Sequence, residues 1–130
     1  MVKKEREIAL SEDQVNTAID LAVQRKLDWI YVENFPLTSS MIQRLAKLST
    51  LVQVRLINTQ LQDSDILPLL SCENLAFVNL SGNQITLEGA AQFAKLSSLK
   101  RLILTDTPAS NSPGAMEFLK TKIPDAIIVF

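Results

Sequence analysis

The segment LAFVNLSGNQI spans residues 75–85 and has apolar side chains at Leu75, Val78, Leu80 and Ile85, with a polar one at Asn83. The alternation around Val78 and Leu80 predicts a short β-strand with one buried face. The following Ser-Gly-Asn predicts a turn, because Gly and Asn tolerate left-handed backbone and Asn can bond main-chain groups.

The same pattern recurs in register at intervals of 24 residues. The equivalent positions hold Leu27, Ile30, Val32, Phe35 and Leu37, then Leu51, Val54, Leu56, Thr59 and Leu61, then Leu99, Leu102, Leu104, Thr107 and Ala109, and finally Ile123, Ala126 and Ile128. Five copies in a chain this short are hard to obtain by chance. A fixed period of about 20–29 residues with this leucine spacing predicts a solenoid, in which stacked repeats share one continuous core.

Residues 27–130 therefore resemble the leucine-rich-repeat family and its L-x-x-L-x-L-x-x-N-x-L segment. Asn83 matches the asparagine of the family, and Thr59 and Thr107 resemble variants in which threonine takes that position. Phe35 departs from both, so the first turn is expected to lack the usual side-chain bond to the main chain. The resemblance implies an α/β leucine-rich-repeat solenoid, with a curved parallel sheet on the concave side and helices on the convex side. It says little about function, because one fold hosts many functions.

Residues 1–26 are predicted to form an N-terminal cap on the repeats of residues 27–130, within a single domain. Ser11 and Gln14 fit a capping box, and apolar side chains then recur at helical spacing, which predicts a helix over about residues 12–25. A short leading strand near Ile8 is also expected, because this position falls 24 residues before Val32.

The convex side is expected to hold a helical segment in each repeat. Residues 39–47 and 86–95 carry apolar inner faces, whereas Pro68 predicts a short or irregular helix in residues 64–71. The last helix should begin near Pro113-Gly114 with Ala115, Phe118 and Leu119 facing inward. Its apolar side chains come one residue late, which predicts a small insertion before Pro124.

Composition argues against several classes of function. A net charge of −1 and a pI near 5.4 disfavour generic binding to nucleic acid or to anionic membranes. No apolar run approaches the length of a membrane span, and the basic start of the chain lacks a secretory pattern, so a cytoplasmic location is the expectation. The single cysteine rules out an internal disulfide.

The sequence also predicts a protein without enzyme activity, cofactor or metal. It has no histidine, and its three glycines form no phosphate-binding motif. Asp63, Asp65 and Asp106 are the nearest candidates for carboxylate chemistry, but the first two are expected at the start of a helix in water. Cys72 is expected to be a small buried apolar residue rather than a reactive thiol.

The predicted strands place a distinctive set of side chains on the face opposite the core. If the fourth and sixth positions of each repeat point inward, the third, fifth and seventh point outward and form columns. The candidate partner-binding residues are Trp29, Tyr31, Glu33, Arg55, Ile57, Phe77, Asn79, Arg101 and Ile103. Ile127 and Val129 were placed in the fifth and seventh columns. Aromatic and arginine side chains among apolar neighbours are typical of protein interfaces.

The hypothesis is therefore a non-enzymatic module that binds another protein through the concave face. Trp29, Tyr31 and Phe77 would be apolar anchors, Arg55 and Arg101 would orient acidic or carbonyl groups, and Glu33 with Asn79 would add polar specificity. An alternative is that Trp29 and Tyr31 pack against each other or under the N-terminal segment. Another is a structural or assembly subunit that uses the apolar edge of the strand at residues 126–130, and this edge also suggests self-association.

Overall fold

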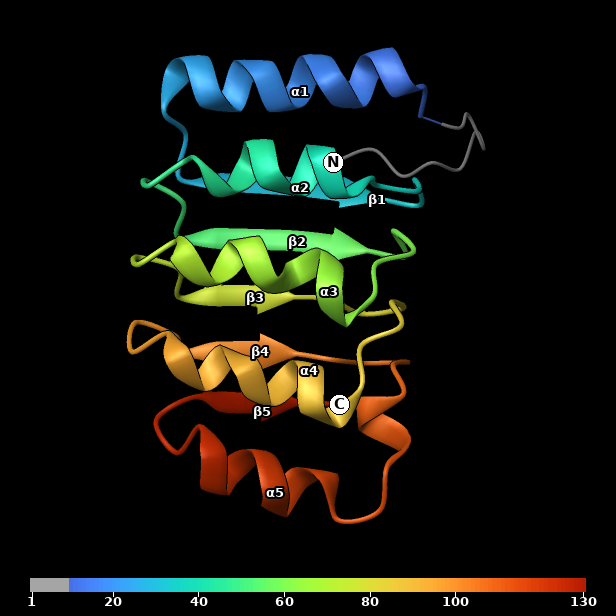
Figure 1. The fold of residues 1–130 in the computed structure, drawn as a ribbon, viewed down its shortest axis with the longest axis vertical. Helices are drawn as coiled ribbons and strands as arrows, with labels where there is room; N and C mark the ends of the chain where they lie inside the picture. Colours follow the sequence, from blue (N-terminus) through green and yellow to red (C-terminus); the bar gives the residue numbers. More distant parts are fainter. Residues whose placement is uncertain (1–9) are drawn as a thin grey trace.

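A computed structural model of the chain describes residues 10–130, so the expected leading strand near Ile8 lies outside the described residues. Five parallel strands form one sheet in the order β1-β2-β3-β4-β5 (Figure 1). The strands are β1 (Trp29–Glu33), β2 (Gln53–Ile57), β3 (Phe77–Asn79), β4 (Arg101–Ile103) and β5 (Ile127–Val129). Trp29 pairs with Gln53, Gln53 with Phe77 and Phe77 with Arg101, which confirms the 24-residue register over four strands.

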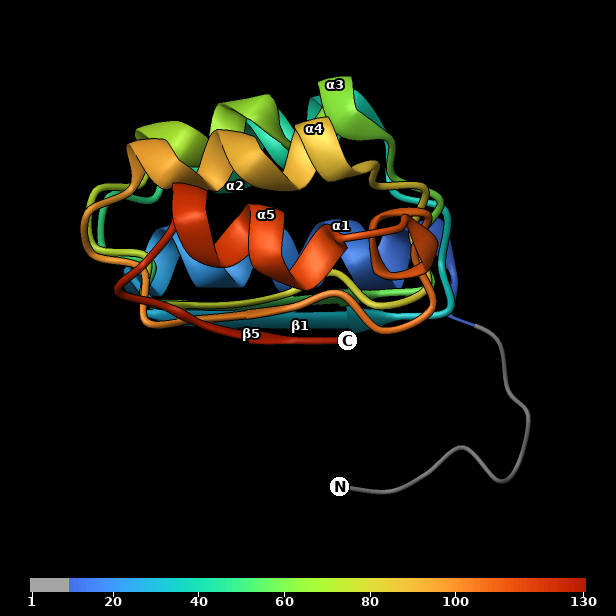
Figure 2. The ribbon, with the colours of Figure 1, turned by 90° about the horizontal axis from the view of Figure 1, so that it is seen from below.

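Helical segments lie on one side of the sheet (Figure 2). They are α1 (Glu12–Arg25), α2 (Ser39–Ala46), α3 (Asp63–Ile66), α4 (Leu87–Ala91) and α5 (Ala115–Lys122), with 3-10 turns η1 (Leu67–Ser71), η2 (Gln92–Lys95) and η3 (Ala109–Asn111). The expected helix over residues 86–95 is therefore a short α-helix continued by a 3-10 turn. Pro68 falls at the start of η1, so the segment after β2 is irregular as predicted.

The core lies between the sheet and the helical layer. Val54, Leu56, Leu80, Leu102 and Leu104 are completely buried, and their neighbours along each strand point to the other side. Ile42, Leu45, Leu69 and Phe93 close the core from the helical layer without any exposed area. The inside-outside alternation predicted from the sequence is confirmed.

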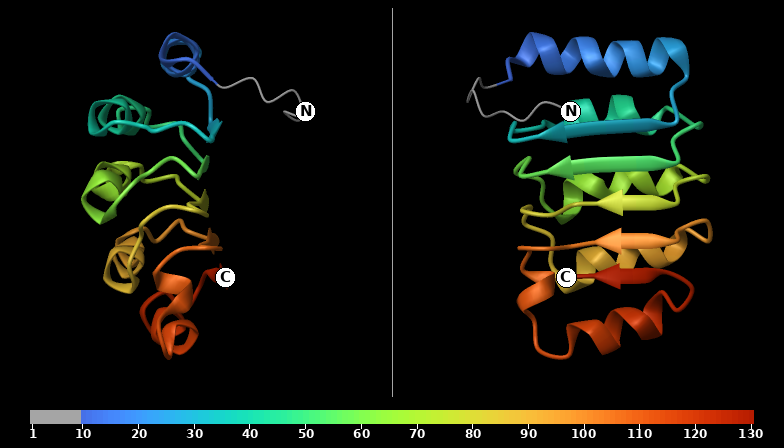
Figure 3. Two further views of the ribbon diagram at one scale, coloured as in Figure 1. Left: turned by 90° about the vertical axis from the view of Figure 1, so that its right-hand side faces the viewer. Right: turned by 180° about the vertical axis from the view of Figure 1, so that it is seen from behind.

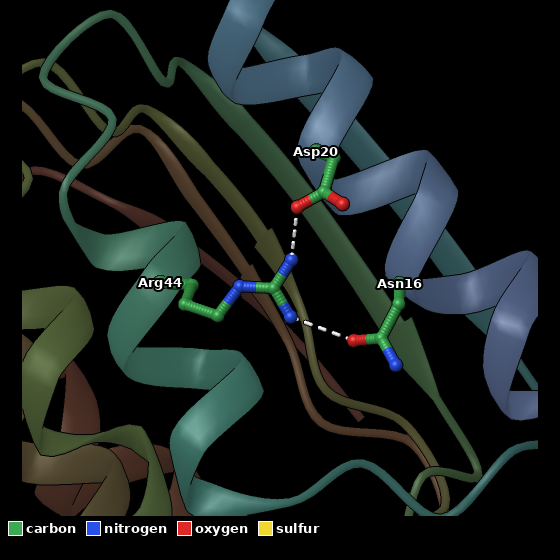
Figure 4. A network of polar contacts seen from close by, with 3 residues as sticks. All are labelled: Asn16, Asp20 and Arg44. Atoms are coloured by element: carbon green, nitrogen blue, oxygen red, sulfur yellow. Dashed lines mark hydrogen bonds and ion pairs between the residues drawn. The ribbon is translucent and has the colours of Figure 1, made fainter.

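Helix α1 lies at the end of the stack beside β1 (Figures 1 and 3). The capping box at its start is present: Ser11 Oγ accepts from the Gln14 N–H at 3.1 Å, and Gln14 Oε1 accepts from the Ser11 N–H at 2.8 Å. Val15, Ile19 and Ala22 form its buried stripe. On the flank, Arg44 of α2 donates to Asn16 Oδ1 at 2.6 Å and forms an ion pair with Asp20 (Figure 4).

The turn after β3 is held by Asn83, which has no exposed area. Its Oδ1 atom accepts from the Thr59 N–H, the Thr59 hydroxyl and the Leu61 N–H, each at 3.0 Å. Its Nδ2 group donates to the Leu56 carbonyl at 2.6 Å and to the Leu80 carbonyl at 3.0 Å. One side chain thus ties the turn after β3 to the turn after β2.

Equivalent turn residues adopt the left-handed backbone conformation in four successive repeats. These are Asn34 (φ 60°), Asn58 (φ 53°), Gly82 (φ 74°) and Asp106 (φ 57°), spaced by 24 residues. Gly, Asn and Asp are the residue types that enter this region at least cost. The Asn58 side chain also donates to Asn34 Oδ1 at 3.1 Å, which links two members of this column.

The last strand departs from the predicted register. β5 pairs Ile127 with Arg101 and Val129 with Ile103, so two extra residues separate β4 from β5. Ile127 therefore belongs to the third column and Val129 to the fifth, and the earlier assignments of both are wrong. The insertion itself was predicted. It lies between Ala109, which holds the same buried position as Ile85, and Leu119, which is equivalent to Phe93 shifted by two.

Two predicted core positions near the C-terminus are also wrong. Phe118 is 37% exposed and its ring lies 5.5 Å from Lys122 Nζ, because Ala115, Leu119 and Ile123 form the buried stripe of this segment. Ala126 is only half-buried, because the shifted register gives the core position of β5 to Ile128.

Candidate protein-binding surface

The side of the sheet away from the helical layer carries the predicted binding residues (Figure 3). We call the outward-pointing side chains of β1–β5 the strand face. The structure places all nine candidates on the four strands β1–β4, at positions that alternate with buried ones. Trp29 is 52% exposed and Phe77 is 43% exposed, although both belong to the residue types that dominate protein cores.

A polar and aromatic cluster joins β1 to β2 on this face. The Tyr31 hydroxyl donates a short hydrogen bond to Glu33 Oε1, two residues along the same strand. The guanidinium carbon of Arg55 lies 5.6 Å from the centroid of the Tyr31 ring, within the range of a cation–π contact. Tyr31 and Arg55 are cross-strand neighbours, so the pairing of β1 with β2 produces this contact.

The environment of Tyr31 changes its acidity. The hydrogen bond to Glu33, together with partial burial and the nearby Glu33 charge, raises the pKa of Tyr31. The positive charge of Arg55 acts in the opposite direction and lowers it. The phenol is therefore held neutral as a donor to Glu33, which leaves the ring surface as the part of Tyr31 that can contact a partner.

An open depression of about 250 Å³ lies across β2, β3 and β4. Its lining includes Arg55, Phe77, Asn79, Arg101 and Ile103, which are five of the nine predicted residues. Val54 and Val78 also contribute, and they are core residues whose edges form the floor. The structure thus brings together candidates from three different repeats.

The polar groups of this depression are mainly donors. Arg55 and Arg101 are exposed, and within residues 10–130 neither has a carboxylate within ion-pair distance. Asn79 Oδ1 already accepts from the N–H of Ser81 at 3.0 Å and from its hydroxyl at 2.6 Å. The Nδ2 group of Asn79 is therefore the part of this side chain that remains for a ligand. Such a lining suits a ligand that presents acceptors.

The other four candidates do not line the depression. Trp29, Tyr31 and Glu33 lie beside it on β1, and Ile57 pairs with Glu33 at the far end of β2. Gln53 does line it and was not among the predicted site residues. Its position in the third column, between Trp29 and Phe77, was the signal that could have identified it.

The carboxylates considered for chemistry have structural contacts. Asp63 Oδ1 accepts from the Thr86 N–H at 2.9 Å, just before α4, and Asp65 Oδ2 accepts from the Gln62 N–H at 2.8 Å, just before α3. Cys72 is completely buried, and burial raises the pKa of its thiol. Each of these groups is therefore accounted for by the fold, as the sequence predicted for Asp63, Asp65 and Cys72.

Comparison with protein families and with curated proteins gives no match. Solved structures do match, at low identity. The leucine-rich-repeat domain of Mex67 from Chaetomium thermophilum has a TM-score of 0.66 and 16% identity, and the alignment covers 92% of this chain and 91% of that one. The Chaetomium Mex67:Mtr2 structure gives a TM-score of 0.68 at 16% identity, with 92% and 89% covered.

A third match is the actin-binding site 2 of leiomodin-1, with a TM-score of 0.67 and 15% identity, covering 94% of this chain and 82% of that one. Likenesses at this identity show the fold alone. None of the helices in residues 10–130 is both long and apolar enough to cross a membrane. The parallel sheet, the helical layer and these structural neighbours together show that the chain has the α/β fold of leucine-rich-repeat domains.

Proposed function

We propose that the chain is a non-enzymatic interaction module whose strand face holds a partner protein. The observation that carries this proposal is the exposure of Trp29 and Phe77 on a sheet face that no described helix covers. Exposed aromatic side chains flanked by arginines are the composition of energetic centres in protein interfaces. The structural neighbours include a two-protein assembly and an actin-binding site, which is consistent with a protein partner.

Each candidate residue has a proposed role. Trp29, Tyr31 and Phe77 supply apolar contact area, and Tyr31 is held in place by Glu33 and Arg55. Arg55 and Arg101 bind acceptor groups of the partner, and Asn79 adds a further donor. Ile57 and Ile103 extend the apolar part of the surface.

The test is a comparative capture experiment with the purified chain as bait. A triple variant, Trp29→Ala, Tyr31→Ala and Phe77→Ala, removes the aromatic side chains of the strand face. The matched control, Leu67→Ala with Phe118→Ala, removes apolar side chains that are 46% and 37% exposed on the helical side. We expect a partner to be captured by the wild type and the control but lost from the triple variant, with all three showing similar thermal unfolding.

Equal capture by the wild type and the triple variant would rule out the strand face as the docking surface. Loss of capture from the control alone would move the site to the helical side. Individual truncations of anchors should each weaken binding by about 1–4 kcal/mol, measured by calorimetry once the partner is in hand.

A second candidate function is assembly through the edge of the sheet at β5. Within the described residues β5 pairs only with β4, and Ile127 beside this edge is 56% exposed. An open apolar edge strand can add a strand from another chain. Self-association by this route predicts a mass that rises with concentration in light scattering, whereas a monomer over the whole dilution series would exclude it.

A further inference from the structure

The depression on the strand face has a charge that is opposite to that of the whole chain. The chain has a net charge of −1, yet the residues that line the depression include two arginines and no carboxylate. Asn79 adds an amide donor, because its oxygen is already bonded to Ser81. The nearest described acid on this face is Glu33, which lies outside the depression and is bonded to Tyr31. Carboxylates are the acceptors that arginine binds best, often with two parallel hydrogen bonds.

The strand register sets the distance between the two arginines. Arg55 pairs with Asn79, and Asn79 pairs with Ile103, two residues beyond Arg101. Two strand spacings and two residues along a strand place the Cα atoms of Arg55 and Arg101 about 12 Å apart. The line that joins them crosses β3 between Phe77 and Asn79, over the apolar floor that Val54 and Val78 provide.

From this geometry we infer that the depression binds an extended acidic segment of the partner, with the pattern acid-x-apolar-x-acid. In an extended chain, residues i, i+2 and i+4 point to the same side and span about 13 Å. The two carboxylates then meet Arg55 and Arg101, and the central apolar side chain lies against Phe77 and the floor of the depression. This inference rests on the proposed function and adds the chemistry of the ligand.

A protein segment fits this surface better than a single-stranded nucleic acid, which also favours aromatic and arginine side chains. A nucleic acid carries a phosphate at every nucleotide and would bring some of them close to Glu33, two positions from Tyr31 on β1. A segment with two carboxylates can place both on the arginines and none beside Glu33. The nucleic acid is retained as an arm of the test.

The test uses synthetic twelve-residue peptides in a Gly-Ser background and records amide chemical-shift changes of the labelled protein up to millimolar peptide. The main probe contains Glu-Gly-Leu-Gly-Glu. The matched probes have the same composition with the second Glu moved to i+3, both Glu replaced by Gln, or both replaced by Lys. A thymidine oligonucleotide of similar length is the last probe.

We expect the Glu-Gly-Leu-Gly-Glu peptide to bind at least tenfold more tightly than each matched peptide, with shifts centred on β2–β4 and weakening as salt increases. The double variant Arg55→Glu with Arg101→Glu should lose this peptide and instead prefer the Lys peptide. Its thermal unfolding should stay near that of the wild type, because both arginines are exposed.

Equal binding of all peptides, absence of binding, or tighter binding of the oligonucleotide would overturn the inference. These results are distinguishable from failure of the proposed function. A partner that is lost from the triple aromatic variant but kept by the double arginine variant would leave the strand face as the docking surface and exclude the acidic segment.

Discussion

Replacing Asn83 by alanine should destabilise the protein far more than removal of one polar side chain usually does. Asn83 is completely buried and bonds two main-chain N–H groups of the preceding turn, those of Thr59 and Leu61. Alanine leaves both N–H groups buried without an acceptor. The Leu56 carbonyl would keep only the Thr59 hydroxyl, at 3.4 Å.

The magnitude follows from the two lost acceptor bonds. Each buried donor left without a partner costs about 1–3 kcal/mol, so Asn83→Ala should lower the free energy of unfolding by about 2–6 kcal/mol. This is a large share of the roughly 5–15 kcal/mol that stabilises a typical domain. Urea unfolding followed by circular dichroism measures it, and the midpoint should fall without a change in the slope.

Two further variants show whether the bonds between turns are the cause. Asn74→Ala is the matched control, because Asn74 is exposed and makes one bond, from Nδ2 to the Ser49 carbonyl at 3.1 Å; we expect less than about 1 kcal/mol there. Asn83→Thr introduces the residue found at positions 59 and 107. The Thr107 hydroxyl donates to Leu104 of its own turn, at 2.7 Å, and does not reach back to the preceding one.

Threonine at position 83 should therefore cost nearly as much as alanine. If Asn83→Thr unfolds like the wild type, or if Asn83→Ala and Asn74→Ala have equal effects, the proposed role of Asn83 between neighbouring turns is refuted.

Two other predictions concern a helix start and the strand face. Gly89→Ala in α4 should lower stability by about 1–3 kcal/mol, although alanine normally favours helices, because its Cβ would lie 2.0 Å from Asp63 Oδ1 and displace the carboxylate that accepts just before the helix. In urea unfolding, the double variant Asp63→Ala with Gly89→Ala should be no less stable than Asp63→Ala alone, and a further loss would contradict this cause. Tyr31 is the single tyrosine, so absorbance near 295 nm reports its titration. Glu33→Gln should lower the pKa of Tyr31 and Arg55→Ala should raise it, because Glu33 raises and Arg55 lowers that pKa. Because the folded state holds the proton more tightly, the stabilisation is complete below the phenol's unfolded pKa and is lost as pH rises through the folded pKa. Unchanged titration in both variants would refute the assigned contacts.

The strands were predictable from the sequence because two independent periods agree. The alternation of Val78 and Leu80 sets which face is buried, and the 24-residue repeat sets which residues become neighbours across strands. Together they determine the columns of the strand face without any knowledge of side-chain contacts. The capping box at Ser11 was predictable for a similar reason, because it is local in sequence.

Features that depend on side-chain conformation were not predictable in this way. The bond from Tyr31 to Glu33 and the contact of Arg55 with the Tyr31 ring both require particular rotamers. The extent of the depression likewise depends on how Phe77 and Gln53 fill the space between strands. The sequence could place these residues on one face but could not show which of them share one hollow.

The register error at β5 explains why the predicted face survived it. Because side chains alternate along a strand, a shift by one residue exchanges the buried and displayed faces, whereas a shift by two preserves them. The insertion between Ala109 and Leu119 adds two residues, so Ile128 remains buried and Ile127 and Val129 still point outward. Only their columns changed. The strand face thus depends on the parity of the repeat length more than on its value, and a period read from sequence is most secure for inside-outside assignments.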